Sequence, residues 1–163
     1  MRMALSRAAW LLAGSVLLAG CGSTGGSLFP GLGGASLDAQ RHRLARELAG
    51  TPVVVAAVDD GYRVAVPLKY AFDPRRSAVK PPLAAVLDRV AQGVKDEPGA
   101  QVRVTAPGDG RSSPMLARDR AESTRDYLIA RGVPRERFAG VEAGADGTDV
   151  EITVSARRAT AAR

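Results

Sequence analysis

Apolar residues recur at helical spacing in three parts of the chain. In the central part they lie on one face of a stretch that Pro81 and Pro82 introduce and that ends before Pro98-Gly99. Their spacing is i, i+3, i+4, i+7 and i+11, at Leu83, Val86, Leu87, Val90 and Val94. This pattern predicts a well-formed amphipathic helix.

Two further helices are expected on either side of the central one. The first runs over residues 36–48, with Ser36 as its N-cap and Gly50 at its end, and it carries His42 on its polar side. Its apolar residues near one face are Leu37, Leu44 and Leu48. The other begins at a Ser113 cap with Pro114 in its first turn, and Gly132 is suited to its C′ position. Its inner stripe comprises Ala117, Ala121, Thr124 and Leu128.

Strand-like stretches fill the intervals between these helices. Two β-rich runs, 51–58 and 62–72, flank Asp60-Gly61 and predict a hairpin, in which Pro67 lies on an edge strand or ends the strand locally. Alternating valines predict a short strand around 102–104, and a similar alternation predicts a last strand over 150–154. The order helix, hairpin, helix, strand, helix, strand indicates an α+β fold, with a small mixed sheet and the two long helices on one face.

The N-terminus has the pattern of an export signal. Basic residues precede an uncharged, largely apolar run that is too short to span a bilayer, so residues 1–20 predict a signal peptide. Leu18-Ala19-Gly20-Cys21 resembles a bacterial lipobox, which implies a lipid-modified Cys21 at the start of the mature chain. Gly22 in place of Asp favours the outer membrane, and residues 21–35 are expected to be the lipidated cysteine and a Gly/Ser-rich tether.

Composition narrows the chemistry further. The formal charge of +6 suggests an anionic partner, while Cys21 and His42, each the only residue of its type, allow neither an intramolecular disulfide nor a Cys/His zinc site. Export and scarce aromatic residues argue against nucleic acid as the partner.

Two interpretations of the arginine-rich helix and tail stay open: a face for an anionic wall polymer or lipid, and an ordinary solvated surface. These arginines are Arg118, Arg120, Arg125, Arg131, Arg135, Arg137, Arg157 and Arg158.

Enzyme motifs are absent or isolated. Ser77 and Lys80 match S-x-x-K, but the other elements of penicillin-binding enzymes are missing, so coincidence explains the match better. Neither G-x-S-x-G nor H-E-x-x-H occurs, and the Asp146 region lacks the spacing of a calcium loop. We therefore expect no catalysis, no metal and no cofactor.

Asp109 and Arg120 are the remaining candidates for a binding site. Asp109 lies between two glycines, as in an ordinary turn, and Arg120 lies about 60° from the inner stripe of its helix, where it borders the core. A bordering arginine often lays its stem on apolar surface and keeps its head in water. From the residues alone, a binding site and ordinary turn and helix chemistry both remain possible.

A resemblance to a known family favours the binding site. The stretches KYAFDPRRSAVKPPLAAVLDRVAQGV, VRVTAPGD, LARDRAESTRDYLIARGVPRERF and DVEITV resemble the OmpA-like domain of Gram-negative envelope proteins. The resemblance implies a β-α-β-α-β layer over residues 66–155. The helix and hairpin at 36–65 are expected to lead into this layer, and the composition of residues 156–163 predicts a basic, frayed tail. That family binds peptidoglycan non-covalently. By resemblance, Asp109 takes the ammonium end, and Arg120 the carboxylate end, of diaminopimelate in the stem peptide.

We therefore expect an outer-membrane lipoprotein whose domain faces the periplasm and tethers that membrane to peptidoglycan. The loop from Gly110 to Met115 is shorter than is usual in the family and lacks the common Asn. This departure supports an alternative, in which the domain has lost wall binding and docks another envelope protein in an assembly or secretion complex.

Overall fold

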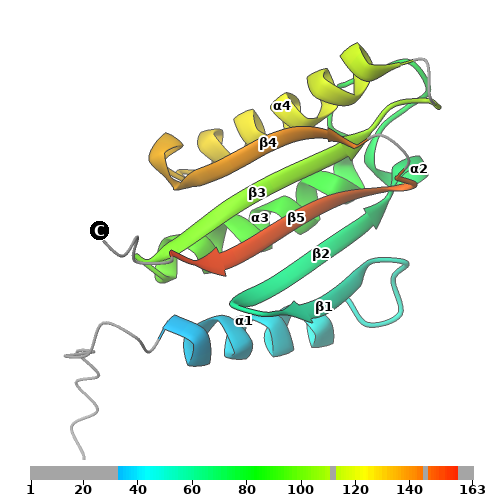
Figure 1. The fold of residues 1–163 in the computed structure, drawn as a ribbon. Coiled ribbons are helices and arrows are strands. Elements are labelled where there is room, and N and C mark those ends of the chain that lie inside the picture. The colour runs from blue at the N-terminus through cyan, green and yellow to red at the C-terminus, as the bar shows by residue number, and fades with distance from the viewer. Residues whose placement is uncertain (1–32, 111–112, 145–146, 158–163) are drawn as a thin grey trace, which may run out of the picture.

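A mixed sheet organises the part of the chain that the computed structural model describes, residues 33–110, 113–144 and 147–157. Its strand order is β1-β2-β5-β3-β4 (Figure 1), and β3 and β4 are its parallel pair while the other neighbours are antiparallel. In chain order the elements are α1 (Gly33–Glu47), β1 (Val54–Val58), β2 (Gly61–Pro67), α2 (Leu68–Ala71), α3 (Pro81–Asp96), β3 (Ala100–Pro107), α4 (Pro114–Ala130), the 3-10 helix η1 (Arg135–Arg137), β4 (Phe138–Gly144) and β5 (Asp149–Ala156).

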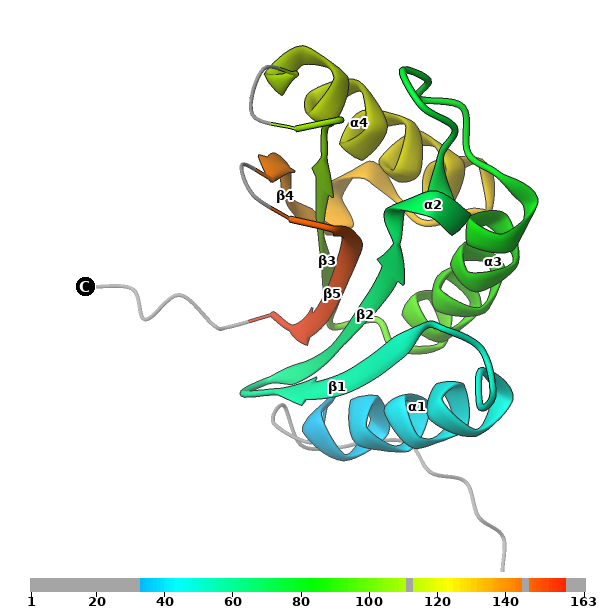
Figure 2. The same ribbon diagram turned by 90° about the vertical axis from the view of Figure 1, so that its right-hand side faces the viewer.

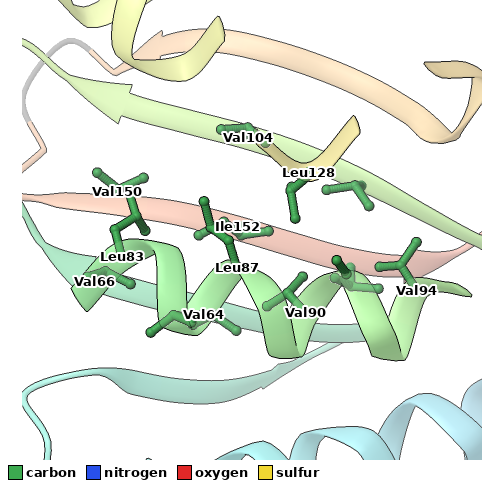
Figure 3. Close-up of a cluster of buried hydrophobic side chains, with 14 of the residues drawn as sticks. Val64, Val66, Leu83, Leu87, Val90, Val94, Val104, Leu128, Val150 and Ile152 are labelled. Atoms are coloured by element: carbon green, nitrogen blue, oxygen red, sulfur yellow. The ribbon is translucent and has the colours of Figure 1, made fainter. Parts of the chain in front are cut away.

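The two long helices, α3 and α4, cover the same face of the sheet, as Figure 2 shows from the side. The predicted α+β layer is thus confirmed. All five apolar residues of the α3 stripe are buried, and several of them face valines and Ile152 of the central strands (Figure 3). α1 lies beside β1 and joins this core through Leu37 and Leu44, as does Leu48 directly after the helix. α1 contacts α3 where Gln40 Nε2 donates to the Gly93 carbonyl at 2.9 Å. In the described residues, no helix is both long and apolar enough to cross a bilayer.

Along β5, the opposite face of the sheet is polar. Along β5, Val150, Ile152 and Val154 are buried in the core, whereas Glu151 and Thr153 point the other way and are partly exposed. Alternation of this kind is what a strand with one solvated face requires.

The C-terminus of α4 agrees with the sequence. Gly132 has φ +92°, and its N–H donates to the Ile129 carbonyl at 2.9 Å. The Val133 N–H donates to the Leu128 carbonyl at 3.1 Å, which completes a Schellman motif, and both of these side chains are buried. Glycine suits this position because an L side chain strains a positive φ.

One strand was not predicted. β4 runs parallel to β3 at the edge of the sheet, with Gly140 opposite Arg103 and Val141 opposite Val104. Its sequence is FAGVEAG, in which the two large apolar residues, Phe138 and Val141, lie three positions apart. It therefore shows no period-two alternation. An edge strand with partly exposed residues does not need that alternation.

The predicted start of the first helix is wrong. α1 begins at Gly33, so Ser36 lies inside the helix instead of capping it. Residues 1–32, which include the predicted signal peptide, Cys21 and most of the predicted tether, lie outside the described residues. Ser113 does occupy the N-cap position of α4, but its side chain makes no capping hydrogen bond.

The second strand of the hairpin is shorter than its β-rich sequence. β2 ends at Pro67, which has no N–H to continue the ladder, and residues 68–71 form the helical turn α2 instead of strand. β2 lies between β1 and β5, so Pro67 ends the strand locally and does not mark an edge. At the other end of the chain, β5 extends to Ala156, and the Arg157 N–H donates to the Gly99 carbonyl at 2.8 Å.

Candidate functional site

β2 and β3 finish, and β5 begins, at the same end of the sheet (Figure 1). An open cleft lies at this end. Its volume is about 750 Å³. One wall comes from α2 and the segment that follows it, and another comes from the loop Gly108–Gly110 after β3. Residues 147–149, which lead into β5, line the remainder. Asp109 and Arg120, the two residues singled out from the sequence, both line this cleft.

Arg120 is buried and its guanidinium is held by backbone carbonyls. The exposed fraction of its side chain is 0%. Nε donates to the Arg76 carbonyl at 2.9 Å, Nη1 to the Pro107 carbonyl at 3.1 Å, and Nη2 to the Asp73 carbonyl at 3.1 Å. The guanidinium carbon also lies 5.3 Å from the centre of the Phe72 ring. One side chain of α4 therefore fixes the end of β3 and the segment after α2.

Asp109 completes this arrangement on the side of the cleft. Its Oδ1 lies 2.7 Å from Arg120 Nη2, and its Oδ2 accepts a hydrogen bond from the backbone N–H of Arg75. The Arg75 N–H, and after it the Arg120 guanidinium, hold the pKa of the Asp109 carboxyl below its usual value. The lowered pKa keeps this carboxylate ionised at neutral pH. Its side chain is 27% exposed and lines the cleft, so the carboxylate is accessible from the cleft.

The backbone around Asp109 is shaped for this contact. Arg75 has φ +57°, in the left-handed region that costs a non-glycine residue about 1–2 kcal/mol. That conformation aims its N–H at Asp109. On the other side, a Cβ at Gly108 would lie 2.5 Å from the Ser113 carbonyl oxygen, so the chain can pass close to the start of α4 only with glycine there.

The structure thus brings together the two residues that the sequence singled out. The expectation that Arg120 borders the core with a solvated head is wrong, because its whole side chain is buried. Sequence reasoning missed the partners of Arg120 and Asp109 on residues 73–76. Those partners are backbone carbonyls and an N–H, and a backbone group leaves no signature in residue type.

Two lysines also line the cleft, and their environments differ. Lys80 Nζ lies 3.0 Å from Asp73 Oδ1 and donates to the Lys69 carbonyl at 3.0 Å. Lys69 is exposed, and its Nζ lies 4.9 Å from the centre of the Tyr70 ring. The ion pair with Asp73 gives Lys80 a structural role, which agrees with discounting the S-x-x-K match at Ser77.

Most of the described arginines of α4 and the following turn have partners within the chain. Arg118 pairs with Glu122, Arg125 with Asp126, and Arg131 with Asp88. Arg137 Nη1 donates to the carbonyls of Glu97 and Ala100. This local pairing favours the interpretation of a solvated surface over a dedicated basic face. Arg158 lies outside the described residues.

Comparison with known proteins agrees with this geometry. No protein-family model matches the chain. The chain is 16% identical to the OmpA-like domain of FopA1 from Francisella tularensis, with a TM-score of 0.51 over 64% of this chain and 79% of that one. The chain has the OmpA-like fold. It is also 27% identical to the cell wall anchor of the T6SS from Pseudomonas aeruginosa, with a TM-score of 0.59 over 72% of this chain and 99% of that one.

A curated relative extends the comparison to sequence. The chain is 29% identical over 114 residues to the peptidoglycan-associated lipoprotein of Rhizobium meliloti. The match covers 65% of this chain and 65% of the length of that relative. The resemblance drawn from the sequence motifs is therefore confirmed by both fold and sequence comparison.

Proposed function

We propose that this protein is an envelope lipoprotein that binds peptidoglycan non-covalently in the cleft at Asp109. The observation that carries the proposal is the ionised carboxylate of Asp109, which is accessible from an open cleft of an OmpA-like fold. One of its oxygens contacts the Arg120 guanidinium, and the other accepts a hydrogen bond from the Arg75 N–H. The names of the relatives, a peptidoglycan-associated lipoprotein and a cell wall anchor, point to the same ligand.

The chemistry of the stem peptide fits this site. A diaminopimelate residue presents a free amino-acid end, with an ammonium group and a carboxylate group on one carbon. Each Asp109 oxygen keeps a further acceptor position after its contact within the protein, so the carboxylate can accept N–H donors from an ammonium. Binding of this kind breaks no bond, and the proposed function requires no catalysis.

The proposal includes an attachment to the outer membrane. The single cysteine, Cys21, would carry the lipid, and residues before α1 would link the lipid to the domain. Modest affinity at each site is sufficient for a tether, because many copies act together on one polymer. Replacement of Cys21 by Ser should abolish incorporation of labelled palmitate in cells and release the protein from membranes.

Co-sedimentation with insoluble peptidoglycan tests wall binding directly. The full chain, solubilised in detergent, would be pelleted with purified peptidoglycan beside Asp109→Ala, Asp109→Asn and the matched control Glu142→Gln. Glu142 is an exposed carboxylate that pairs with Arg103 on the polar face of the sheet, away from the cleft. Wild type and Glu142→Gln should pellet, and both Asp109 variants should stay in the supernatant.

Circular dichroism on each variant separates loss of binding from loss of fold. Wild type that is folded yet fails to pellet would refute wall binding and favour the alternative, a module that docks another envelope protein. Pelleting of folded Asp109→Asn at the wild-type level would refute the cleft as the site.

A further inference from the structure

We propose that two copies of this protein pair through β1 and form one continuous sheet. β1 lies at one edge of the sheet (Figure 1), so one side of its backbone has no neighbouring strand among the described residues. An edge of this kind, with free backbone groups, is a template for a further strand. No residue of β1 lines the cleft, so the proposal does not depend on wall binding.

The register of the β1–β2 hairpin shows which backbone groups face the open side. Val58 pairs with Gly61 across a two-residue loop, and the pair that closes such a loop is hydrogen-bonded. Hydrogen-bonded pairs then alternate along the strands, so every second residue from Val58 back to Val54 directs its N–H and C=O toward β2. The groups of Val55 and Ala57 therefore point outward, and no hydrogen bond from another described element reaches them. Ala57 is also exposed, so α1 does not cover this part of the strand.

The side chains of β1 favour pairing as well. Its sequence, VVAAV, contains neither a charged residue nor a proline, the features that usually protect an edge from association. Val54 and Val58 are 58% and 36% exposed, and they lie on the same face of the sheet as Ala56. The other edge strand, β4, carries the charged Glu142 and has a glycine at position 140, which weakens a strand. β1 is thus the edge that favours a further strand.

Symmetry identifies the partner of β1 as a second copy of this chain. A two-fold interface uses the same surface on both copies, so the paired strand must be complementary to itself. With the axis at Ala56, Val54 of one copy lies opposite Val58 of the other, and the exposed apolar side chains cover each other. Val55 lies opposite Ala57, and their outward N–H and C=O groups bond to each other across the axis. Ala56 meets its own equivalent in a non-hydrogen-bonded pair, where side chains come closest and a methyl group fits.

Disulfide trapping tests both the pairing and its register. Cys21→Ser removes the only thiol of the chain, and Ala56→Cys then places a single thiol at the proposed axis. The Cα atoms of a non-hydrogen-bonded pair lie about 4.5 Å apart, which a disulfide can bridge. Val54→Cys in the same background is the matched control. Its two equivalent positions would be offset by about 13 Å along the strands, which is too far for a disulfide.

The full chain in detergent would be oxidised and separated by non-reducing electrophoresis. Ala56→Cys should give a covalent dimer, and Val54→Cys should give at least about fivefold less of it. Circular dichroism on the reduced variants establishes that both are folded. Monomer alone from folded Ala56→Cys, or equal dimer yields from the two variants, would overturn the proposal.

A charge on the edge tests the chemistry of the pairing. Val54→Lys, added to the Ala56→Cys protein, removes the apolar contact with Val58 of the second copy at both ends of the interface. It should lower the dimer yield about fivefold, because two cross-strand contacts are lost. The matched control is Ala139→Lys, at an exposed alanine of β4, and it should leave the yield unchanged. Equal yields from the two lysine variants would contradict pairing through β1.

Discussion

Two arginine–carboxylate pairs, one in the cleft and one on the polar face of the sheet, show how surroundings decide what a charge does. In the cleft, the side chain of Arg120 is 0% exposed, and three carbonyls hold it besides Asp109. On the polar face, Arg103 pairs with Glu142, and these side chains are 48% and 55% exposed. Only the first pair contains a fully buried side chain, that of Arg120.

This difference in exposure determines how much each ion pair contributes to stability. Water compensates either partner of the Arg103–Glu142 pair if the other is removed, so that pair contributes little to stability. The side chain of Arg120 is fully buried, and its removal would leave the Pro107 carbonyl, to which it donates in a buried position, without a donor. The cleft thus depends on its arginine for shape, and the other member of the pair, Asp109, stays accessible from the cleft.

Removal of Arg120 should have the largest effect. Arg120→Ala should lower the free energy of unfolding by about 3–5 kcal/mol, because it leaves buried polar groups unpaired and opens a cavity. Arg103→Ala should lower it by less than about 1 kcal/mol. Urea unfolding of both variants beside wild type measures the two effects. Equal losses would contradict the contrast between the two pairs.

Asp109 should show its contribution through pH. Its pKa is lowered in the folded protein, chiefly by the Arg75 N–H, so its stabilisation is fully present above the ordinary carboxyl pKa near 4 and is lost as pH falls through the lower folded value. Wild type should therefore be more stable than Asp109→Asn at pH 7, and the gap should close in acid, below pH about 4. Glu142→Gln is the matched comparison on the polar face. A gap between wild type and Asp109→Asn that stays constant from pH 7 to pH 2 would show that the charge contributes nothing.

Replacement of Arg75 should have the smallest effect, because its backbone N–H, and not its side chain, binds Asp109. Arg75→Gly relieves the strain at φ +57° while keeping the N–H that binds Asp109, and it makes the unfolded chain more flexible. These effects nearly cancel, so thermal unfolding should show a change within about 1 kcal/mol of wild type. Peptidoglycan pelleting should be retained. Loss of pelleting in this variant would mean that the Arg75 side chain contacts the ligand.

Periodicity predicted the elements whose burial follows a regular pattern. The stripe from Leu83 to Val94 and the alternation from Val150 to Val154 became α3 and β5 because each has one face in a continuous core. β4 has no such pattern, since its small residues lie at the edge of the sheet and are partly exposed. The sequence predicts strand where the turn α2 forms, because four residues are too few to show a helical pattern.

The site was predictable in part, and for a different reason. Motif resemblance placed Asp109 and Arg120 together, and they lie in contact. The burial of Arg120 could not be inferred from the sequence. It depends on backbone carbonyls of Asp73, Arg76 and Pro107, and a residue's type does not show where its carbonyl points. Lys69 reaches the cleft only because β2 stops at Pro67 and the chain then turns.

The most direct test of the account is a titration of the isotope-labelled full chain in detergent with the diaminopimelate stem tripeptide, followed by backbone amide resonances. The account predicts shifts that concentrate at the cleft, in α2, in Gly108–Gly110 and in residues 147–149, while β1 stays unchanged. Shifts confined to β1 and α1, or no shifts at millimolar peptide, would contradict binding in the cleft at Asp109.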